Sequence, residues 1–250
     1  MAYQDMALLY DKLMAGAPYD QWIEFTHKVF EQSGKEFNAI ADLGCGTGEI
    51  TVKLAKAGYK MTGIDYSSEM LTYAEHKASE AKVTVQWLQQ DLRDLDGLTE
   101  LDAAVSYCDV INYITDEEEI SSVFNRVAAS LREGGLFIFD IHSLYHVEHH
   151  FINQTFADVM EDTSYIWFCM EGEQPGEMFH DLTFFSLDGD KYERFEEYHH
   201  QRTYSIKFYQ RLLKDAGFNN LQVYGDFSLE RNSLNEKTER IFFIAEKRSR

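Results

Sequence analysis

The sequence has few of the features that stabilise secreted domains or anchor a chain in a membrane. Its three cysteines, Cys45, Cys108 and Cys169, are odd in number and show no Cys-x-x-Cys spacing, so no disulfide framework or cysteine zinc site is expected. The chain has no run of about 18 apolar residues, and its first residues lack the basic segment and apolar run of a signal peptide. We therefore expect a cytoplasmic protein with no membrane partner.

Basic residues are also scarce. The chain holds 23 Lys and Arg against 43 Asp and Glu, which gives a formal net charge of −20. Nucleic-acid phosphates repel such a chain, so no nucleic-acid partner is expected. The excess of acidic over basic residues is concentrated in residues 144–200, which contain 13 Asp and Glu but only two basic residues, Lys191 and Arg194. This acidic segment favours a small neutral or cationic substrate, or a basic partner protein, over a polyanion.

Proline is nearly absent, with 2 residues in a chain of 250, and hydrophobic residues make up 44% of the chain. This composition is typical of an ordered globular protein. No linker rich in Pro, Gly or Ser divides the sequence, so we expect a single domain over residues 1–250. Residues 1–35 carry apolar side chains at helical spacing around a break at residues 16–18, which predicts a leading helical segment.

From residue 37 onward, short apolar strands alternate with amphipathic helices. The expected strands are residues 39–42, 60–65, 83–88, 101–106, 136–140, 221–227 and 240–246, and the expected helices are residues 50–57, 69–80, 117–131 and 206–216. Strands separated by helices in this order predict an α/β fold, a parallel sheet with helices on both faces.

The alternation is interrupted at about Ser143. Three antiparallel strands are expected at residues 164–171, 179–187 and 191–204, with Asp188-Gly-Asp190 forming a hairpin turn. The sequence therefore predicts a core of residues 37–142 and 205–248 that carries an inserted antiparallel β subdomain of residues 143–204. The chain has 18 Phe, 15 Tyr and 3 Trp, or 36 aromatic residues in all, and 15 of these 36 lie in residues 144–210. The insertion is thus expected to act as a substrate cap or as a homodimer interface.

The sharpest motif is Asp42-Leu-Gly44-Cys45-Gly46-Thr-Gly48-Glu49, between the first expected strand and its helix. Glycines at such a turn allow positive φ angles and let the backbone approach a ligand closely. The N–H groups of the following helix lie beside that turn. A small-molecule site is therefore expected here.

The residues around this turn distinguish between two cofactor classes. Dinucleotide folds space their glycines G-x-G-x-x-G, whereas here the spacing is G-x-G-x-G and Glu49 takes the third position, where its charge opposes a pyrophosphate. Asp42 instead suits an ammonium group. Asp65 suits the two hydroxyls of a ribose, and Asp91 suits an adenine amine. A nicotinamide-dependent oxidoreductase is therefore the disfavoured alternative.

These motifs resemble those of the class I S-adenosylmethionine-dependent methyltransferases, with specific matches over residues 37–141. The resemblance implies a Rossmann-like seven-stranded sheet of order 3-2-1-4-5-7-6, with the last strand antiparallel. An N-terminal segment closing over the cofactor is similar to that of small bacterial members with a β-rich insertion. The cofactor contacts that it implies are Tyr10, Tyr19, Trp22, Asp42, Gly44, Cys45, Gly46, Gly48, Asp65, Tyr66, Met70, Gln90, Asp91, Leu92, Cys108 and Asp109.

Histidines offer the remaining chemistry. His142 follows the fifth expected strand, at the rim of the site, and is interpreted as a general base or substrate ligand, with a turn cap as the alternative. His146, His149 and His150 share one face of a helix at i, i+3, i+4 spacing. Because metal ligands usually converge from several segments, we expect a solvated helix face and no metal. The sequence thus predicts a methyltransferase with an unidentified N or O acceptor; a non-catalytic cofactor-binding protein is the alternative.

Overall fold

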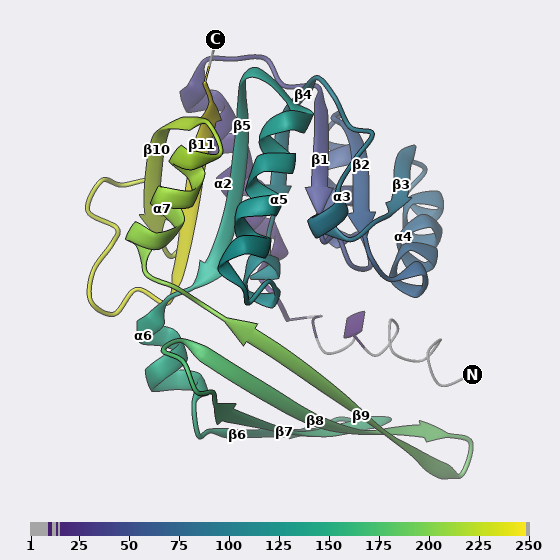
Figure 1. The fold of residues 1–250 in the computed structure, drawn as a ribbon. Helices are drawn as coiled ribbons and strands as arrows, with labels where there is room; N and C mark the ends of the chain where they lie inside the picture. Colours follow the sequence, from purple (N-terminus) through teal and green to yellow (C-terminus); the bar gives the residue numbers. More distant parts are fainter. Residues whose placement is uncertain (1–9, 12–13, 15, 249–250) are drawn as a thin grey trace.

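The computed structural model describes residues 10–11, 14 and 16–248 and contains two β-sheets (Figure 1). The larger sheet has seven strands in the order β10-β11-β5-β4-β1-β2-β3. Numbered along the chain within this sheet, the order is 3-2-1-4-5-7-6, as predicted. Its strands are β1 (Ala39–Leu43), β2 (Lys60–Asp65), β3 (Val85–Gln89), β4 (Leu101–Ser106), β5 (Leu131–His142), β10 (Phe218–Gly225) and β11 (Arg240–Lys247). The last strand, β11, is antiparallel to both β5 and β10, which confirms the Rossmann-like class.

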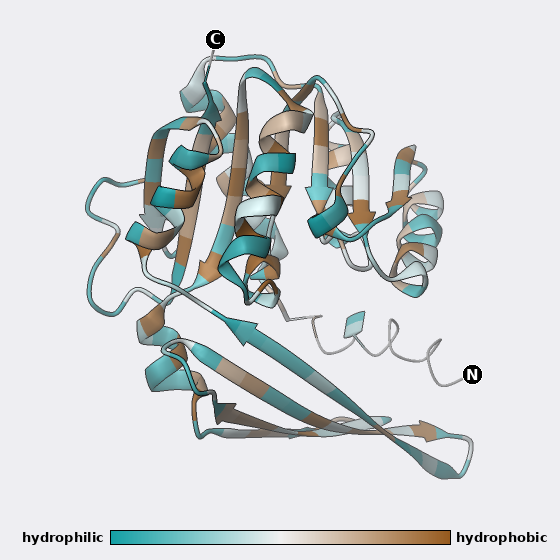
Figure 2. Ribbon diagram, in the orientation of Figure 1, coloured by the Kyte–Doolittle hydropathy of each residue, from teal (hydrophilic) through white to brown (hydrophobic). Residues whose placement is uncertain are grey.

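Helices cover both faces of this sheet because each carries one apolar stripe. On one face, α5 (Glu117–Ser130) and α7 (Ile206–Asp215) bury residues such as Phe124 and Leu213. On the other face, α2 (Tyr19–Ser33) and α3 (Glu49–Lys56) bury Phe25 and Leu54, and α4 (Ser68–Glu80) packs beside α3. Figure 2 shows the resulting concentration of hydrophobic residues in the central strands.

Side-chain caps place two of the helix starts where the sequence predicts them. The Ser67 hydroxyl accepts a hydrogen bond from the backbone N–H of Met70, and the Asp116 carboxylate accepts from Glu118 and Glu119. Several boundaries differ by two or three residues, as at β3 and β10, and the largest difference is at β5, which begins at Leu131 and not at residue 136. Gly134 adopts a positive φ of 71° within a register shift between β4 and β5, so the glycine pair forms a bulge inside the strand and does not precede it.

The second sheet has four antiparallel strands in the order β6-β7-β8-β9, one more than predicted. They are β6 (Thr155–Val159), β7 (Thr163–Glu171), β8 (Glu177–Asp188) and β9 (Lys191–Arg202), and they follow β5 through α6 (Leu144–His146) and the π-helix η3 (Val147–Phe151). The extra strand, β6, is a short edge strand whose residues are mostly exposed, so it lacks the apolar alternation by which sequence reasoning finds strands.

The second sheet lies across the carboxyl ends of the core strands (Figure 1). Side chains alternate along its strands, so that His180 and Gln201 are buried whereas Phe168 and Met170 are 47% and 45% exposed. The inner face therefore meets the edge where doubly wound sheets bind ligands. No helix in the described part of the chain is long and apolar enough to span a bilayer.

Candidate active site

The glycine-rich turn joins β1 to α3 and is fixed against the end of β2. The N–H groups of Gly44 and Cys45 both donate to the carbonyl of Ile64, at 2.8 and 2.9 Å. Gly48 has a φ of 77°, and a Cβ there would lie 2.9 Å from side-chain atoms of Ala74 and Trp87. A larger residue would strain the backbone and push the turn off α4, so glycine is required at this position.

Asp42 is the penultimate residue of β1, two residues before Gly44. Its side chain is 2% exposed, and one carboxylate oxygen accepts a hydrogen bond of 2.5 Å from the Thr51 hydroxyl. Burial raises the pKa of Asp42 to about 7, because the charged form has lost its water. A cation bound beside this carboxylate would restore the charged form, so Asp42 fits the ammonium group of a cofactor.

Asp65 ends β2 on the neighbouring strand. Its two carboxylate oxygens accept from backbone N–H groups of Gly46 at 2.8 Å and Ser67 at 3.0 Å. Burial raises the pKa of Asp65. Each carboxylate oxygen can accept a second hydrogen bond, so this fixed side chain fits a ribose diol.

The other predicted residues of this side lie around the same edge but are engaged differently. Asp91 is held by Arg93, whose guanidinium lies 2.6 Å from one carboxylate oxygen and lowers the pKa of Asp91. The Gln90 amide spans the next turn through the backbone of Asp96. Leu92 is buried, whereas Tyr66 is 77% exposed. Met70 contributes its backbone N–H to the cap of α4.

The N-terminal segment is fastened to the glycine-rich turn. The Asp11 carboxylate accepts from the Thr47 hydroxyl at 2.5 Å and pairs with Lys77 at 2.9 Å. Lys77 also pairs with Glu49 at 3.0 Å, so the Glu49 charge that the sequence sets against a pyrophosphate is partly compensated. Tyr10 and Tyr19 lie close to Cys108, and burial raises the pKa of both phenols.

Trp22, which the resemblance also implies as a cofactor contact, lies in the core next to the site. Its side chain is 3% exposed within the α2 core, and its indole N–H donates to Asp140 at 2.9 Å. The Arg240 guanidinium lies over the same ring, 5.3 Å from its centroid. In this structure Trp22 therefore supports a buried polar group beneath the site.

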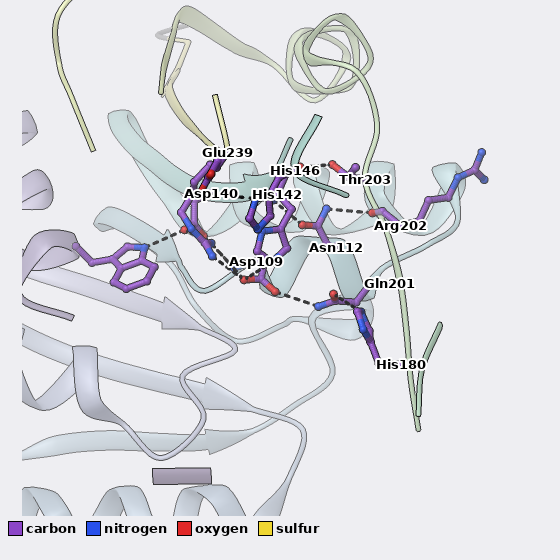
Figure 3. Close-up of polar contacts among 12 residues, drawn as sticks. Asp109, Asn112, Asp140, His142, His146, His180, Gln201, Arg202, Thr203 and Glu239 are labelled. Carbon is purple, nitrogen blue, oxygen red and sulfur yellow. Dashed lines mark hydrogen bonds and ion pairs between the residues drawn. The ribbon is translucent and has the colours of Figure 1, made fainter. Parts of the chain in front are cut away.

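That polar group centres on Asp109, which follows β4 (Figure 3). One carboxylate oxygen of Asp109 lies 3.1 Å from Nε2 of His142 and 3.2 Å from Arg240. Arg240 also pairs with the fully buried Asp140 at 2.7 Å. Burial by itself would raise the pKa of Asp109, but the nearby His142 and Arg240 outweigh burial and hold this pKa well below its usual range. Asp109 is thus a carboxylate at neutral pH, and the fold brings it next to His142, another predicted site residue.

The backbone around Asp109 is strained. Cys108 and Asp109 have φ angles of 57° and 53°, which non-glycine residues adopt rarely. The Asp109 N–H donates to the Asp140 carboxylate at 3.0 Å, which helps hold this conformation. Consecutive left-handed residues cost about 1–3 kcal/mol each, and such strain occurs mainly at functional sites.

A hydrogen-bond chain runs from Asp109 into the inserted sheet. Gln201 donates to Asp109 at 3.0 Å and lies 3.1 Å from Nε2 of His180, while Trp167 donates to Nδ1 of His180 at 2.9 Å. Because an indole only donates, Nδ1 of His180 accepts and Nε2 carries the proton toward Gln201. Burial lowers the pKa of His180 to about 4, which agrees with this neutral form.

Sequence reasoning did not identify this series of hydrogen bonds, nor the two residues that fix the His142 backbone. The Asn112 side chain accepts from the His142 N–H at 2.9 Å, and the Thr203 hydroxyl donates to the His142 carbonyl at 2.5 Å (Figure 3). The only signal in the sequence was the alternation of β8 and β9, which places His180 and Gln201 on one face. The His142 ring lies against His146, with centroids 5.1 Å apart. Burial lowers the pKa of His146 to about 4.

Two surface hollows lie away from these residues. One of about 500 Å³ is lined by Lys35, Asn38, Asp102 and Arg132, at the amino ends of the core strands. That edge lacks the glycine-rich turn and the carboxylates described above, so we do not assign the site to it.

The sheet order and the carboxylate side chains gathered at its carboxyl edge define a Rossmann-like domain that binds a cationic nucleoside cofactor. Residues 40–135 match the family model described as a methyltransferase domain. A relative from Geobacillus sp. (strain WCH70), which carries a provisional methyltransferase name, is 43% identical over 249 residues, or 99% of this chain and 100% of the relative. The chain therefore belongs to the S-adenosylmethionine-dependent methyltransferases, and its cofactor is S-adenosylmethionine.

Two further similarities bear on the site. The crystal structure of an S-adenosylmethionine-dependent methyltransferase from Clostridium acetobutylicum ATCC 824 superposes with a TM-score of 0.89 at 29% identity, covering 100% of both chains. A dTDP-3-amino-3,4,6-trideoxy-alpha-D-glucopyranose N,N-dimethyltransferase of Streptomyces venezuelae is 26% identical over 156 residues, or 62% of this chain and 61% of that protein. The likeness to the crystal structure thus extends over the insertion as well as the core.

Proposed function

We propose that the protein transfers a methyl group by in-line displacement to a nitrogen or oxygen of a small neutral or cationic acceptor. The observation that carries this proposal is the Asp109–His142 pair, 3.1 Å apart at the carboxyl edge of β4 and β5. The pair lies between the glycine-rich turn and the inserted sheet, so an acceptor bound beside it would contact both the cofactor and the inserted sheet. A nitrogen acceptor is favoured because the relative from Streptomyces venezuelae is named for methylating an amino group.

On the cofactor side, we assign the ammonium group to Asp42 and the ribose to Asp65, with the glycine-rich turn giving close backbone approach. When bound, S-adenosylmethionine supplies a methyl carbon activated by a sulfonium. The residues assigned as surrounding contacts are Tyr10, Tyr19, Tyr66, Met70, Gln90, Asp91, Leu92, Cys45 and Cys108. Asp109, which the resemblance implies as a further cofactor contact, is assigned to the acceptor side because His142 and Gln201 contact its carboxylate. Trp22 is assigned only an indirect role, because it reaches Asp140 and Arg240 from the core.

On the acceptor side, His142 takes the proton that the acceptor loses as it gains the methyl group. Asp109 stays ionised, so it can hold the imidazole ring in place and stabilise the positive charge that the ring acquires. The buried Asn112 and Thr203 contacts fix the backbone of His142, which limits how far the ring can move.

We assign residues 143–204 as the substrate cap and residues 1–35 as the segment that closes the cofactor site. The inner face of the cap brings Glu197, His199 and Gln201 toward Tyr113, whose ring lies 5.7 Å from that of His199. Acidic and aromatic side chains around the acceptor favour a cationic or neutral group over a polyanion, and this supports the exclusion of nucleic acid. The free cysteines fit a reducing cytoplasm.

The test is methyl transfer from radiolabelled S-adenosylmethionine to a panel of small amines, amino sugars and hydroxyl compounds. We expect transfer to at least one cationic or neutral compound, loss of turnover by about 100-fold or more in His142→Ala, and unchanged S-adenosylhomocysteine affinity. His76→Ala, on the exposed face of α4, is the matched control and should retain full turnover. Equal turnover in the wild type and His142→Ala would contradict the role of His142. Cofactor binding without transfer to the panel or to cell extract would favour the non-catalytic alternative.

A further inference from the structure

The helix that follows β5 carries three histidines, and the fold brings one additional side chain to two of them. Glu239, in the loop before β11, lies with its carboxylate 3.7 Å from Nδ1 of His146 and 3.8 Å from Nε2 of His150. Figure 3 shows Glu239 beside His146. The three ligand atoms all lie within 4.8 Å of one another. Ligands from two segments 89 residues or more apart in the sequence thus meet at one point.

These separations fit a shared cation better than direct hydrogen bonds. A hydrogen bond between nitrogen and oxygen requires about 3.2 Å or less, so neither imidazole bonds Glu239 directly. A tetrahedral zinc ion with bonds of about 2.0–2.1 Å holds neighbouring ligand atoms about 3.3 Å apart. Small rotations of His150 and Glu239, which are both exposed, would close the remaining gap.

An unsatisfied nitrogen points to the same place. Nδ1 of His146 is buried and has no hydrogen-bond partner. Buried nitrogens without a partner are rare in folded proteins, and a metal ion is one of the explanations for them.

The two ligand segments are also fastened together by the backbone. The N–H of Ser143 donates to the carbonyl of Glu239 at 2.8 Å, and the Ser143 hydroxyl donates to the carbonyl of Thr238 at 2.5 Å. The same hydroxyl accepts from the N–H of His146 at 2.9 Å. The site is therefore held in position before any ion binds.

The helix geometry selects two of the three histidines. Residues 147–151 form a π-turn, in which the N–H of Ile152 donates to the carbonyl of Val147 at 2.9 Å. This wider turn keeps His146 and His150 together, with ring centroids 5.3 Å apart. His149 instead stacks on Tyr145 at 4.4 Å, with Nδ1 3.0 Å from the Tyr145 carbonyl. π-turns occur frequently at functional sites.

We propose that His146, His150 and Glu239 bind a divalent transition-metal ion, with Zn²⁺ as the preferred occupant and water completing its coordination. Imidazole and carboxylate ligands suit zinc, whereas Mg²⁺ and Ca²⁺ prefer oxygen ligands alone. The ion would tie the first residues of the inserted subdomain to the loop before β11, next to the ring of His142. The proposal does not depend on the acceptor or on methyl transfer.

The experiment is calorimetric titration of ZnCl₂ into untagged protein that has been stripped with a chelator and dialysed. We expect one tight equivalent in the wild type and at least a tenfold loss of affinity in His150→Ala and in Glu239→Gln. His149→Ala is the matched control, since it removes a neighbouring histidine outside the cluster, and it should bind zinc as the wild type does. His149, His150 and Glu239 are all exposed, so the three variants should fold.

Cobalt gives a second readout. Co²⁺ at the site should show the visible absorption of a four-coordinate ion in the wild type and His149→Ala but not in His150→Ala, and excess Mg²⁺ should not compete. Zinc affinity that is equal in the wild type, His150→Ala and Glu239→Gln would overturn the proposal, because binding would then reside at the thiols or elsewhere. Equal losses in His149→Ala and His150→Ala would overturn it as well.

Discussion

Nε2 of His142 lies 3.1 Å from the Asp109 carboxylate, although His142 ends β5 and Asp109 follows β4. The same carboxylate is bound by Arg240 from β11 and by Gln201 from the inserted sheet. Asp109 therefore joins the core, the candidate base and the cap in one polar network.

Replacing that carboxylate should slow the reaction without removing the site. In Asp109→Asn the side chain keeps its shape but no longer offsets a positive charge on His142, so we expect turnover to fall about 10²–10³-fold. Affinity for S-adenosylhomocysteine should stay within about threefold of the wild type, because Asp42 and Asp65 are untouched. Single-turnover kinetics and calorimetry measure the two quantities. Asp158→Asn, on the exposed edge strand β6, is the control. Unchanged turnover in Asp109→Asn would refute the role of this carboxylate.

Gly48 should be essential for cofactor binding. Gly48→Ala places a Cβ 2.9 Å from Ala74 and Trp87 at a φ of 77°, so we expect at least a tenfold loss of S-adenosylhomocysteine affinity. Gly58 has a φ of 100° and no atom within 4 Å of an added Cβ. Gly58→Ala should therefore lower stability by about 1 kcal/mol and leave cofactor affinity unchanged. Equal affinities in the two variants would contradict the prediction.

Cofactor affinity should depend on pH through Asp42. Without a ligand, burial holds the pKa of Asp42 at about 7, and a bound ammonium favours the carboxylate, so binding releases a proton below that pH. Affinity should rise by up to about tenfold per pH unit toward pH 7 and then level off. The folding stability of the cofactor-free protein has the opposite pH dependence. Because the pKa of Asp42 is higher in the folded than in the unfolded chain, the folded state gains stability as the pH falls below about 7.

Calorimetry between about pH 5.5 and 8.5 measures this dependence. Asp42→Asn should bind S-adenosylhomocysteine more weakly and with a flat pH profile over the acidic half of the range. A flat profile in the wild type would show that Asp42 does not titrate on binding.

Arg240 should be important for stability because it pairs with two carboxylates at once. Arg240→Met leaves the fully buried Asp140 and the adjacent Asp109 without their shared cation, and we expect the free energy of unfolding to fall by roughly 3–5 kcal/mol. Arg211→Met is the matched control. It breaks an exposed pair with Glu117, for which a loss within about 1 kcal/mol is expected. Urea unfolding compares the two, and similar losses would contradict the prediction.

We also propose that the outer face of the inserted sheet mediates homodimerisation. Ile166, Phe168, Met170 and Phe179 are 38%, 47%, 45% and 38% exposed on neighbouring strands β7 and β8. Met170 pairs directly with Phe179 across the two strands, and exposed apolar patches mark interaction sites. Sedimentation should show a dimer in the wild type and a monomer in Phe168→Glu, whereas Thr72→Glu on the exposed face of α4 should leave the dimer intact. A monomeric wild type would rule out this interface.

Local sequence patterns determined the alternation of core strands and helices along the chain, the positive-φ glycines and the carboxylates near the ends of β1 and β2. Those signals are contained within a few residues, since strand alternation, helix spacing and caps depend on near neighbours. The four-stranded form of the insertion was less visible, because β6 lies at an edge and buries little.

The tertiary structure alone decided which distant side chains meet. Asp109 and Arg240 are separated by 131 residues, and Asp109 and Gln201 by 92, so no local pattern relates them. The packing of α2 likewise directs the indole of Trp22 to Asp140, 118 residues away. The histidine helix alone predicted no metal, and only the fold brings Glu239 to it. Long-range polar contacts follow from how complete elements pack, and the sequence encodes them only through that packing.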